Sequence, residues 1–147
     1  MRTRVSLYLL SVAILSACTT AGGSKIGFFT IEAPVFAKLG DDAFVGKAVG
    51  YTDRTGTIEM TSAITNEKCV GSFAYTGARV GEAKLTCTSG ATVRAQFNSL
   101  GPASGYGVGV SSKGPMSFTF GLTAQEAEAY LTVPNQKPST KNLQSES

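Results

Sequence analysis

The fold is decided by residues 69–87, which read CVGSFAYTGARVGEAKLTC. Two runs of alternating apolar and polar residues flank a turn around Ala78, and such alternation predicts a β-hairpin. Cys69 and Cys87 each lie nine residues from Ala78, so we expect them to face each other across the two strands. One predicted face carries Cys69, Gly71, Phe73, Ala83, Leu85 and Cys87, and the other carries Ser72, Glu82, Lys84 and Thr86. The first face is apolar and the second polar, as a half-buried sheet requires.

Similar hairpins are predicted on both sides of this one. Residues 44–61 repeat its order, from an opening Val-Gly through Tyr-Thr and an Arg-x-Gly turn, and residues 93–110 form a weaker third copy. The copies are spaced by about 25 residues, a repeat-like period. The same alternation places Ile58, Met60, Val93, Ala95, Phe97, Met116, Phe118 and Phe120 inward, and Thr57, Glu59, Thr61, Arg94, Gln96, Ser117 and Thr119 outward. The fold class is therefore mainly β: an antiparallel hairpin meander, as an open sheet or a small barrel or sandwich.

The two ends of this region are less regular. Residues 26–31 are compatible with a strand, and residues 34–39 with a short helix that has Pro early and Gly40 just past its end. Residues 123–126 (TAQE) have the spacing of a capping box and predict a short C-terminal helix. We expect that helix to pack on the open apolar face or to cover an edge. Residues 26–133 thus form one β-rich domain, and residues 134–147, polar and aperiodic, are expected to be a disordered tail.

A short apolar run follows Arg2 and Arg4 and ends in Leu15-Ser16-Ala17-Cys18. This ending resembles the lipobox of bacterial lipoproteins. The resemblance implies that residues 1–17 are a signal peptide and that cleavage makes Cys18 the new N-terminus. Cys18 would then be acylated with diacylglycerol and an N-linked chain such as palmitate. An ordinary cleaved signal and the start of a transmembrane helix are the alternatives, although the run is shorter than the ~20 apolar residues of a span. Residues 18–25 would then be the lipidated Cys and a flexible tether.

The resemblance also implies a cellular location. We expect a lipid anchor in the bacterial cell envelope, and Thr19, rather than Asp, resembles the lipoproteins sorted to the outer membrane. Beyond the cytoplasmic membrane, Cys69 and Cys87 are expected to form a disulfide. Two free buried thiols or a two-thiolate metal site are the alternatives, and no C-x-x-C spacing favours the metal site.

Composition excludes several classes of function. Without Arg2 and Arg4, eleven basic residues face ten acids, and no run of Lys or Arg remains to bind nucleic acid. The chain has no His, which removes the commonest general base and metal ligand. We therefore expect no catalysis, no metal site and no cofactor other than the lipid on Cys18.

Two arginines are candidates for binding. Arg54 and Arg79 occupy matching turns of two hairpins, so both guanidinium groups should lie on one rim, where they could meet phosphate or carboxylate groups. The alternative is that exposed turns simply favour polar residues. The alternating glycines of residues 105–109 lack the spacing of a phosphate loop, and we expect them to let another backbone or side chain pack closely.

Two further family resemblances bear on function. The hairpins, with their Val-Gly-Ser-Phe (residues 70–73) and Gly-Tyr-Gly-Val-Gly (residues 105–109) elements, resemble MORN-type repeats, which implies an interaction scaffold. Ser104-Gly105-Tyr106 and Lys113-Gly114 resemble shortened inhibitory loops of the C-type lysozyme inhibitors, which implies that Ser104 and Lys113 contact a lysozyme's carboxylates. We therefore expect a lipid-anchored structural or binding protein with an envelope protein or cell-wall partner, with a lysozyme-type inhibitor as the alternative.

Overall fold

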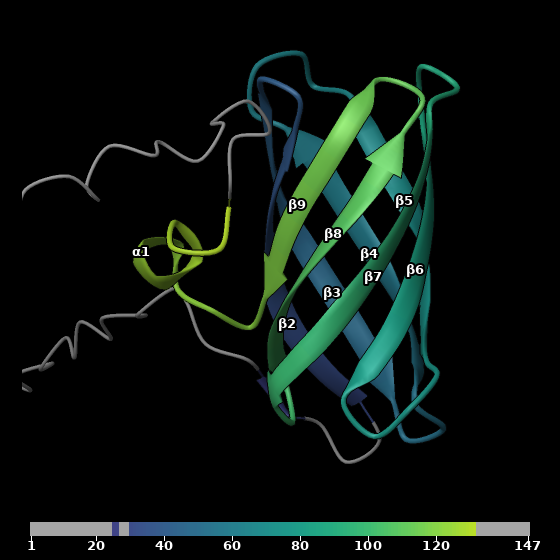
Figure 1. Ribbon diagram of the computed structural model, residues 1–147, viewed down its shortest axis with the longest axis vertical. Coiled ribbons are helices and arrows are strands. Elements are labelled where there is room, and N and C mark those ends of the chain that lie inside the picture. The colour runs from purple at the N-terminus through teal and green to yellow at the C-terminus, as the bar shows by residue number, and fades with distance from the viewer. Residues whose placement is uncertain (1–24, 27–29, 132–147) are drawn as a thin grey trace, which may run out of the picture.

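The computed structural model describes residues 25–26 and 30–131. Cys18 and the predicted tail, residues 134–147, lie outside this part of the chain. The described elements are β1 (Lys25–Ile26), β2 (Thr30–Leu39), β3 (Asp42–Tyr51), β4 (Thr55–Ser62), β5 (Lys68–Tyr75), β6 (Val80–Cys87), β7 (Thr92–Gly101), β8 (Ser104–Ser111), β9 (Gly114–Phe120) and α1 (Ala124–Ala127) (Figure 1). Within the described ranges, no helix is long and apolar enough to cross a membrane.

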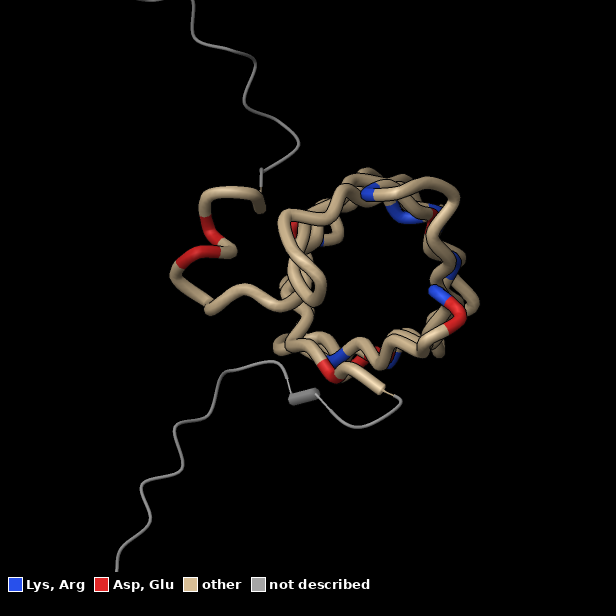
Figure 2. Tube along the Cα trace, turned by 90° about the horizontal axis from the view of Figure 1, so that it is seen from below, with Lys and Arg blue, Asp and Glu red and all other residues tan. Residues whose placement is uncertain are grey.

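The strands close into a barrel. Each strand pairs antiparallel with the next, and β2 also pairs with β9, from Val35 opposite Phe120 to Leu39 opposite Met116. Viewed along its axis, the chain forms a closed ring (Figure 2). The predicted meander is confirmed, and of the three arrangements that the sequence allowed, β2 to β9 adopt the barrel. Closure gives both outer strands a partner and so removes the exposed edges that an open sheet would keep.

Residues 34–39 are part of β2, so the alternative of a short helix is wrong. Ala33, Val35, Ala37 and Leu39 are buried at every second position, which is the period of a strand. Pro34 is tolerated because the pairing with β9 begins only at Val35, so no ladder bond to β9 is lost. Its carbonyl instead accepts a hydrogen bond from the Gly121 N–H at 2.8 Å.

The central hairpin has the predicted register. Cys69 lies opposite Cys87, Gly71 opposite Leu85 and Phe73 opposite Ala83. The two cysteines form a disulfide with their Cα atoms 3.9 Å apart, and they are 0% and 4% exposed. Phe44, Met60 and Val93, three of the largest fully buried side chains, lie near the β2–β3, β4–β5 and β6–β7 turns, in the same half of the barrel as the disulfide. Bulky side chains and the disulfide therefore fill this half.

The predicted capping box is present in α1. The Thr123 hydroxyl accepts a hydrogen bond from the Glu126 N–H at 3.3 Å, and the Glu126 carboxylate accepts one from the Thr123 N–H at 2.9 Å. The expected packing of this helix is wrong, because the barrel closes on itself and leaves no open apolar face. The helix lies outside the barrel, beside β2 and β9 (Figures 1 and 2), and the Tyr130 ring stacks on Tyr106 of β8 at 4.8 Å.

Ser117 and Thr119 point outward, as predicted, yet they are only 2% and 0% exposed. The outer face of β9 is therefore covered, on the side of the barrel where α1 lies. No described residue supplies a hydrogen-bond partner to the Thr119 hydroxyl.

Candidate ligand-binding site

An apolar cavity of about 440 Å³ opens at the other end of the barrel (the lower end in Figure 1). This end carries the β3–β4, β5–β6 and β7–β8 turns, the start of β2 and the end of β9. The deeper walls include Val35, Ala48, Ile58, Phe73, Phe97 and Phe118, and the mouth includes Tyr51, Arg54, Thr55, Arg79, Ser99 and Pro102. Its volume lies within the usual range for small-molecule sites.

The cavity exists because small residues alternate with flattened aromatic rings at this end. Three inward glycines each lie directly opposite an inward phenylalanine on the next strand: Gly56 with Phe73, Gly81 with Phe97, and Gly105 with Phe120. A Cβ at these glycines would approach the facing ring to 2.3, 2.2 and 2.5 Å. Each ring therefore lies against glycine backbone instead of standing across the lumen.

The aromatic side chains of the cavity support one another. Phe97 meets Phe73, Tyr75 and Phe120 edge to face, with ring centroids 5.9, 5.0 and 5.6 Å apart. The Tyr75 hydroxyl and the Ser99 hydroxyl are hydrogen-bonded at 2.9 Å. This bond satisfies the phenol while its ring remains in the apolar wall.

The structure places Arg54 and Arg79 at the mouth of this cavity, on the same rim. Each one reaches the next turn along the barrel: Arg54 donates to the carbonyls of Gly77 and Ala78, and Arg79 donates to the carbonyl of Leu100 at 3.1 Å. The Arg54 guanidinium also lies over the Tyr75 ring, 4.8 Å from its centroid. The arginines thus link three successive turns and hold two cations at the opening.

The charge of this mouth is not cancelled by ion pairs. Among the described residues, the ion pairs join Lys47 to Glu32, Lys68 to Glu59 and Lys113 to Glu67, and none involves Arg54 or Arg79. The cavity lining contains no Asp or Glu. The neighbouring Asp53 instead accepts hydrogen bonds from the hydroxyl and N–H of Thr55, which lower the pKa of its carboxyl.

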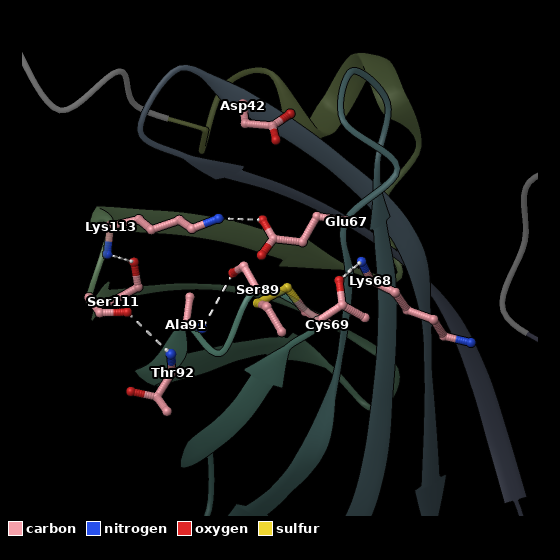
Figure 3. The surroundings of a disulfide bond; sticks show 12 residues. Asp42, Glu67, Lys68, Cys69, Ser89, Ala91, Thr92, Ser111 and Lys113 are labelled. Atoms are coloured by element: carbon pink, nitrogen blue, oxygen red, sulfur yellow. Dashed lines mark hydrogen bonds and ion pairs between the residues drawn. A yellow bond between two sulfur atoms is a disulfide. The ribbon is translucent and has the colours of Figure 1, made fainter.

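The opposite end of the barrel is more polar (Figure 3). Lys113, in the β8–β9 turn, donates to the Glu67 carboxylate at 2.8 Å, and the side chains are 46% and 9% exposed. The hydrogen bond from Lys113 is the main cause that lowers the pKa of Glu67. The Asp42 carboxylate accepts a hydrogen bond from the Ser62 hydroxyl at 2.8 Å. The polar groups at this end thus form two pairs, Lys113 with Glu67 and Ser62 with Asp42. No cluster of three metal-ligating side chains occurs among the residues described.

Ser104 and Lys113 are not brought together. Ser104 begins β8 beside the cavity mouth, whereas Lys113 follows the far end of the same strand. The two loops that resemble an inhibitor's contacts thus lie at opposite ends of the barrel. Nothing in this geometry favours the inhibitor alternative.

The cavity was missed by sequence reasoning, although a signal for it was present. Gly56 and Gly81 end the two Arg-x-Gly motifs and lie near the starts of β4 and β6, and the phenylalanines that cover them follow at a similar spacing on the next strand. The alternating glycines of β8 serve the close approach that the sequence predicted, since a Cβ at Gly107 would lie 2.4 Å from the Phe118 ring. Repeated glycine–phenylalanine pairs at one end of a meander could therefore have indicated a hollow there.

No protein-family model and no curated protein matches this chain. Among solved structures, it is similar to a redesigned β-barrel, mFAP1, bound to DFHBI, with a TM-score of 0.52 and 15% identity over 62% of this chain and 92% of that one. It is also similar to a second redesigned β-barrel, b11L5F_LGL, with a TM-score of 0.51 and 15% identity over 63% of this chain and 89% of that one. At this identity the similarity shows the fold alone.

Proposed function

We propose that this chain is a lipid-anchored protein of the bacterial envelope whose barrel binds a small apolar molecule. The observation that carries this proposal is the cavity, which has aromatic and aliphatic walls and opens to solvent at one end. Binding would need only that an apolar ligand leaves water and fits the shape of the cavity.

The lipobox-like Leu15-Ser16-Ala17-Cys18 supports the anchoring half of the proposal. Each buried methylene contributes ~0.8 kcal/mol, and stable anchoring needs more than one acyl chain, which the modified Cys18 would supply. The tether of residues 18–25 would then hold the barrel near the bilayer, which is a source of apolar molecules. An envelope protein or the cell wall would be a further partner.

The redesigned barrel mFAP1 was solved bound to DFHBI, so a chain of this fold can hold a small organic molecule. This precedent concerns that protein. For the present chain it supports only the feasibility of a barrel that carries a ligand.

The proposal is tested by titrating the disulfide-intact domain with the neutral fluorescent probe N-phenyl-1-naphthylamine. Ala48 is buried in the cavity wall, so Ala48→Phe, or the milder Ala48→Leu, should fill the space and weaken probe binding at least tenfold. Ala74 is exposed on the outer face of β5, and Ala74→Phe adds the same ring outside the cavity as a matched control. No saturable binding to the wild type, or equal binding by the Ala48 variants when circular dichroism shows them folded, would overturn the proposal.

A further inference from the structure

We infer that the ligand is an amphipathic anion, whose apolar body fills the cavity and whose single carboxylate, sulfonate or phosphate group meets Arg54 and Arg79 at the mouth. This inference rests on the proposed function and adds the chemical class of the ligand and its orientation.

The polarity of the site changes along its depth. Val35, Ile58 and Phe118 form the deep walls and offer a ligand no polar side-chain group. The charged side chains of the lining are Arg54 and Arg79, and both are exposed at the mouth. A ligand that is apolar at one end and anionic at the other matches this gradient, whereas a cation would meet two positive charges.

The two guanidinium groups at the mouth are already held in place. Hydrogen bonds to the carbonyls of Gly77, Ala78 and Leu100 fix them on the rim, and the Tyr75 ring supports Arg54 from below. Each guanidinium carries more N–H donors than these bonds use, so donors remain for an incoming anion. Preorganised arginines bind oxyanions through charge-assisted hydrogen bonds and lose little side-chain freedom when they do so.

Among the residues that the structure describes, no carboxylate forms an ion pair with Arg54 or Arg79. Elsewhere in the described barrel, Lys47, Lys68 and Lys113 each pair with a glutamate, but the arginines at the mouth pair with neutral carbonyls. The nearest acid in sequence, Asp53, is bound to Thr55. Neither guanidinium group is therefore engaged by a described carboxylate, and both remain available to an anion that enters.

The test compares two probes that differ by one anionic group: N-phenyl-1-naphthylamine and its sulfonated form, 8-anilinonaphthalene-1-sulfonate. The measured quantity is the ratio of their affinities in the wild type and in Arg54→Met/Arg79→Met. In the variant the affinity for the sulfonate should fall roughly five- to tenfold more than the affinity for the neutral probe, and this difference should shrink as salt is raised. Lys84→Met/Arg94→Met removes the same charge from the exposed outer wall and should leave the ratio unchanged.

Competition identifies the source of the anion. Displacement of the sulfonate by dodecanoate but not by dodecan-1-ol points to a fatty-acyl ligand, and displacement by 1-naphthoate alone points to an aromatic acid. Either result supports the inference. An affinity ratio that is the same in the wild type and the mouth variant overturns the inference while the proposed function stands, and failure of both probes to bind the wild type overturns both.

Discussion

At the scale of single residues, the cystine is the clearest determinant of stability. Cys69 and Cys87 are buried directly opposite each other, and the bond closes a segment with a sequence separation of 18 residues. A cross-link of this size mainly restricts the unfolded chain and stabilises the fold by roughly 3 kcal/mol.

We therefore expect Cys69→Ala/Cys87→Ala to lower the free energy of unfolding by roughly 2–4 kcal/mol. Urea denaturation followed by circular dichroism measures this loss. Val70 and Thr86 form the adjacent outward pair on the same strands, so Val70→Ala/Thr86→Ala is the control and should change stability much less. Equal urea midpoints for the wild type and the cysteine variant would show that the disulfide adds no stability.

The ion pair of Glu67 and Lys113 should give the barrel a pH dependence. The hydrogen bond from Lys113 holds the pKa of Glu67 below its ordinary value of 4.5. Above about pH 4.5 the charged Glu67 carboxylate therefore stabilises the folded barrel, and this stabilisation is lost as pH falls through the lowered pKa that Glu67 has in the folded state.

Glu67→Gln should accordingly be less stable than the wild type at pH 7, and the difference should shrink as pH falls below about 4.5. Thermal unfolding across this pH range measures it. Glu82→Gln removes an exposed carboxylate from the outer face of β6 and serves as the control. A difference between Glu67→Gln and the wild type that is constant with pH would show that the ion pair is not its cause.

At the scale of strands and hairpins, the repeated contact of phenylalanine with glycine shapes the cavity. A Cβ at Gly81 would lie 2.2 Å from the Phe97 ring and 2.6 Å from the Ala74 carbonyl oxygen, so the backbone itself obstructs it. At Gly50, on the same inner face, the nearest atom would be 3.6 Å away, which is ordinary contact.

Gly81→Ala should therefore destabilise the barrel by about 1–3 kcal/mol through overpacking and should displace the Phe97 ring into the lumen. Gly50→Ala should be neutral or should stabilise the barrel by up to about 1 kcal/mol, because alanine restricts the unfolded chain. Denaturation midpoints of the two variants test this contrast, and equal effects would contradict the role assigned to the glycine–phenylalanine contact.

The elements that the sequence misassigned share one physical cause. Pro34 and Gly40 stand where the start and the end of a short helix would place them. Residues 34–39 nevertheless form a strand, because they pair with both β3 and β9. The capping box of α1 could be predicted because it depends on two residues only three positions apart, Thr123 and Glu126. The place where α1 packs depends on closure of the barrel, which no local pattern contains.

At the scale of the whole molecule, the proposed lipid on Cys18 would decide where the barrel works. Intact mass spectrometry of the membrane-purified protein should show loss of residues 1–17 and the added mass of acyl chains. Cys18→Ala should abolish that mass and release the protein from membranes. An unmodified Cys18, or an uncut signal peptide in the wild type, would contradict the anchor and leave the cavity proposal to be judged on probe binding.

The hairpins, their inner and outer faces, the disulfide and the capping box could be predicted from the sequence, because each depends on alternation or spacing along short stretches of chain. The lipobox-like motif is likewise a local pattern of residues. The placement of Arg54 and Arg79 on one rim could also be predicted, but the pairing of β2 with β9 and the cavity beneath that rim became apparent only in the folded barrel. These features depend on contacts between residues far apart in the chain and on the space that side chains leave unfilled, which alternation along a strand does not specify.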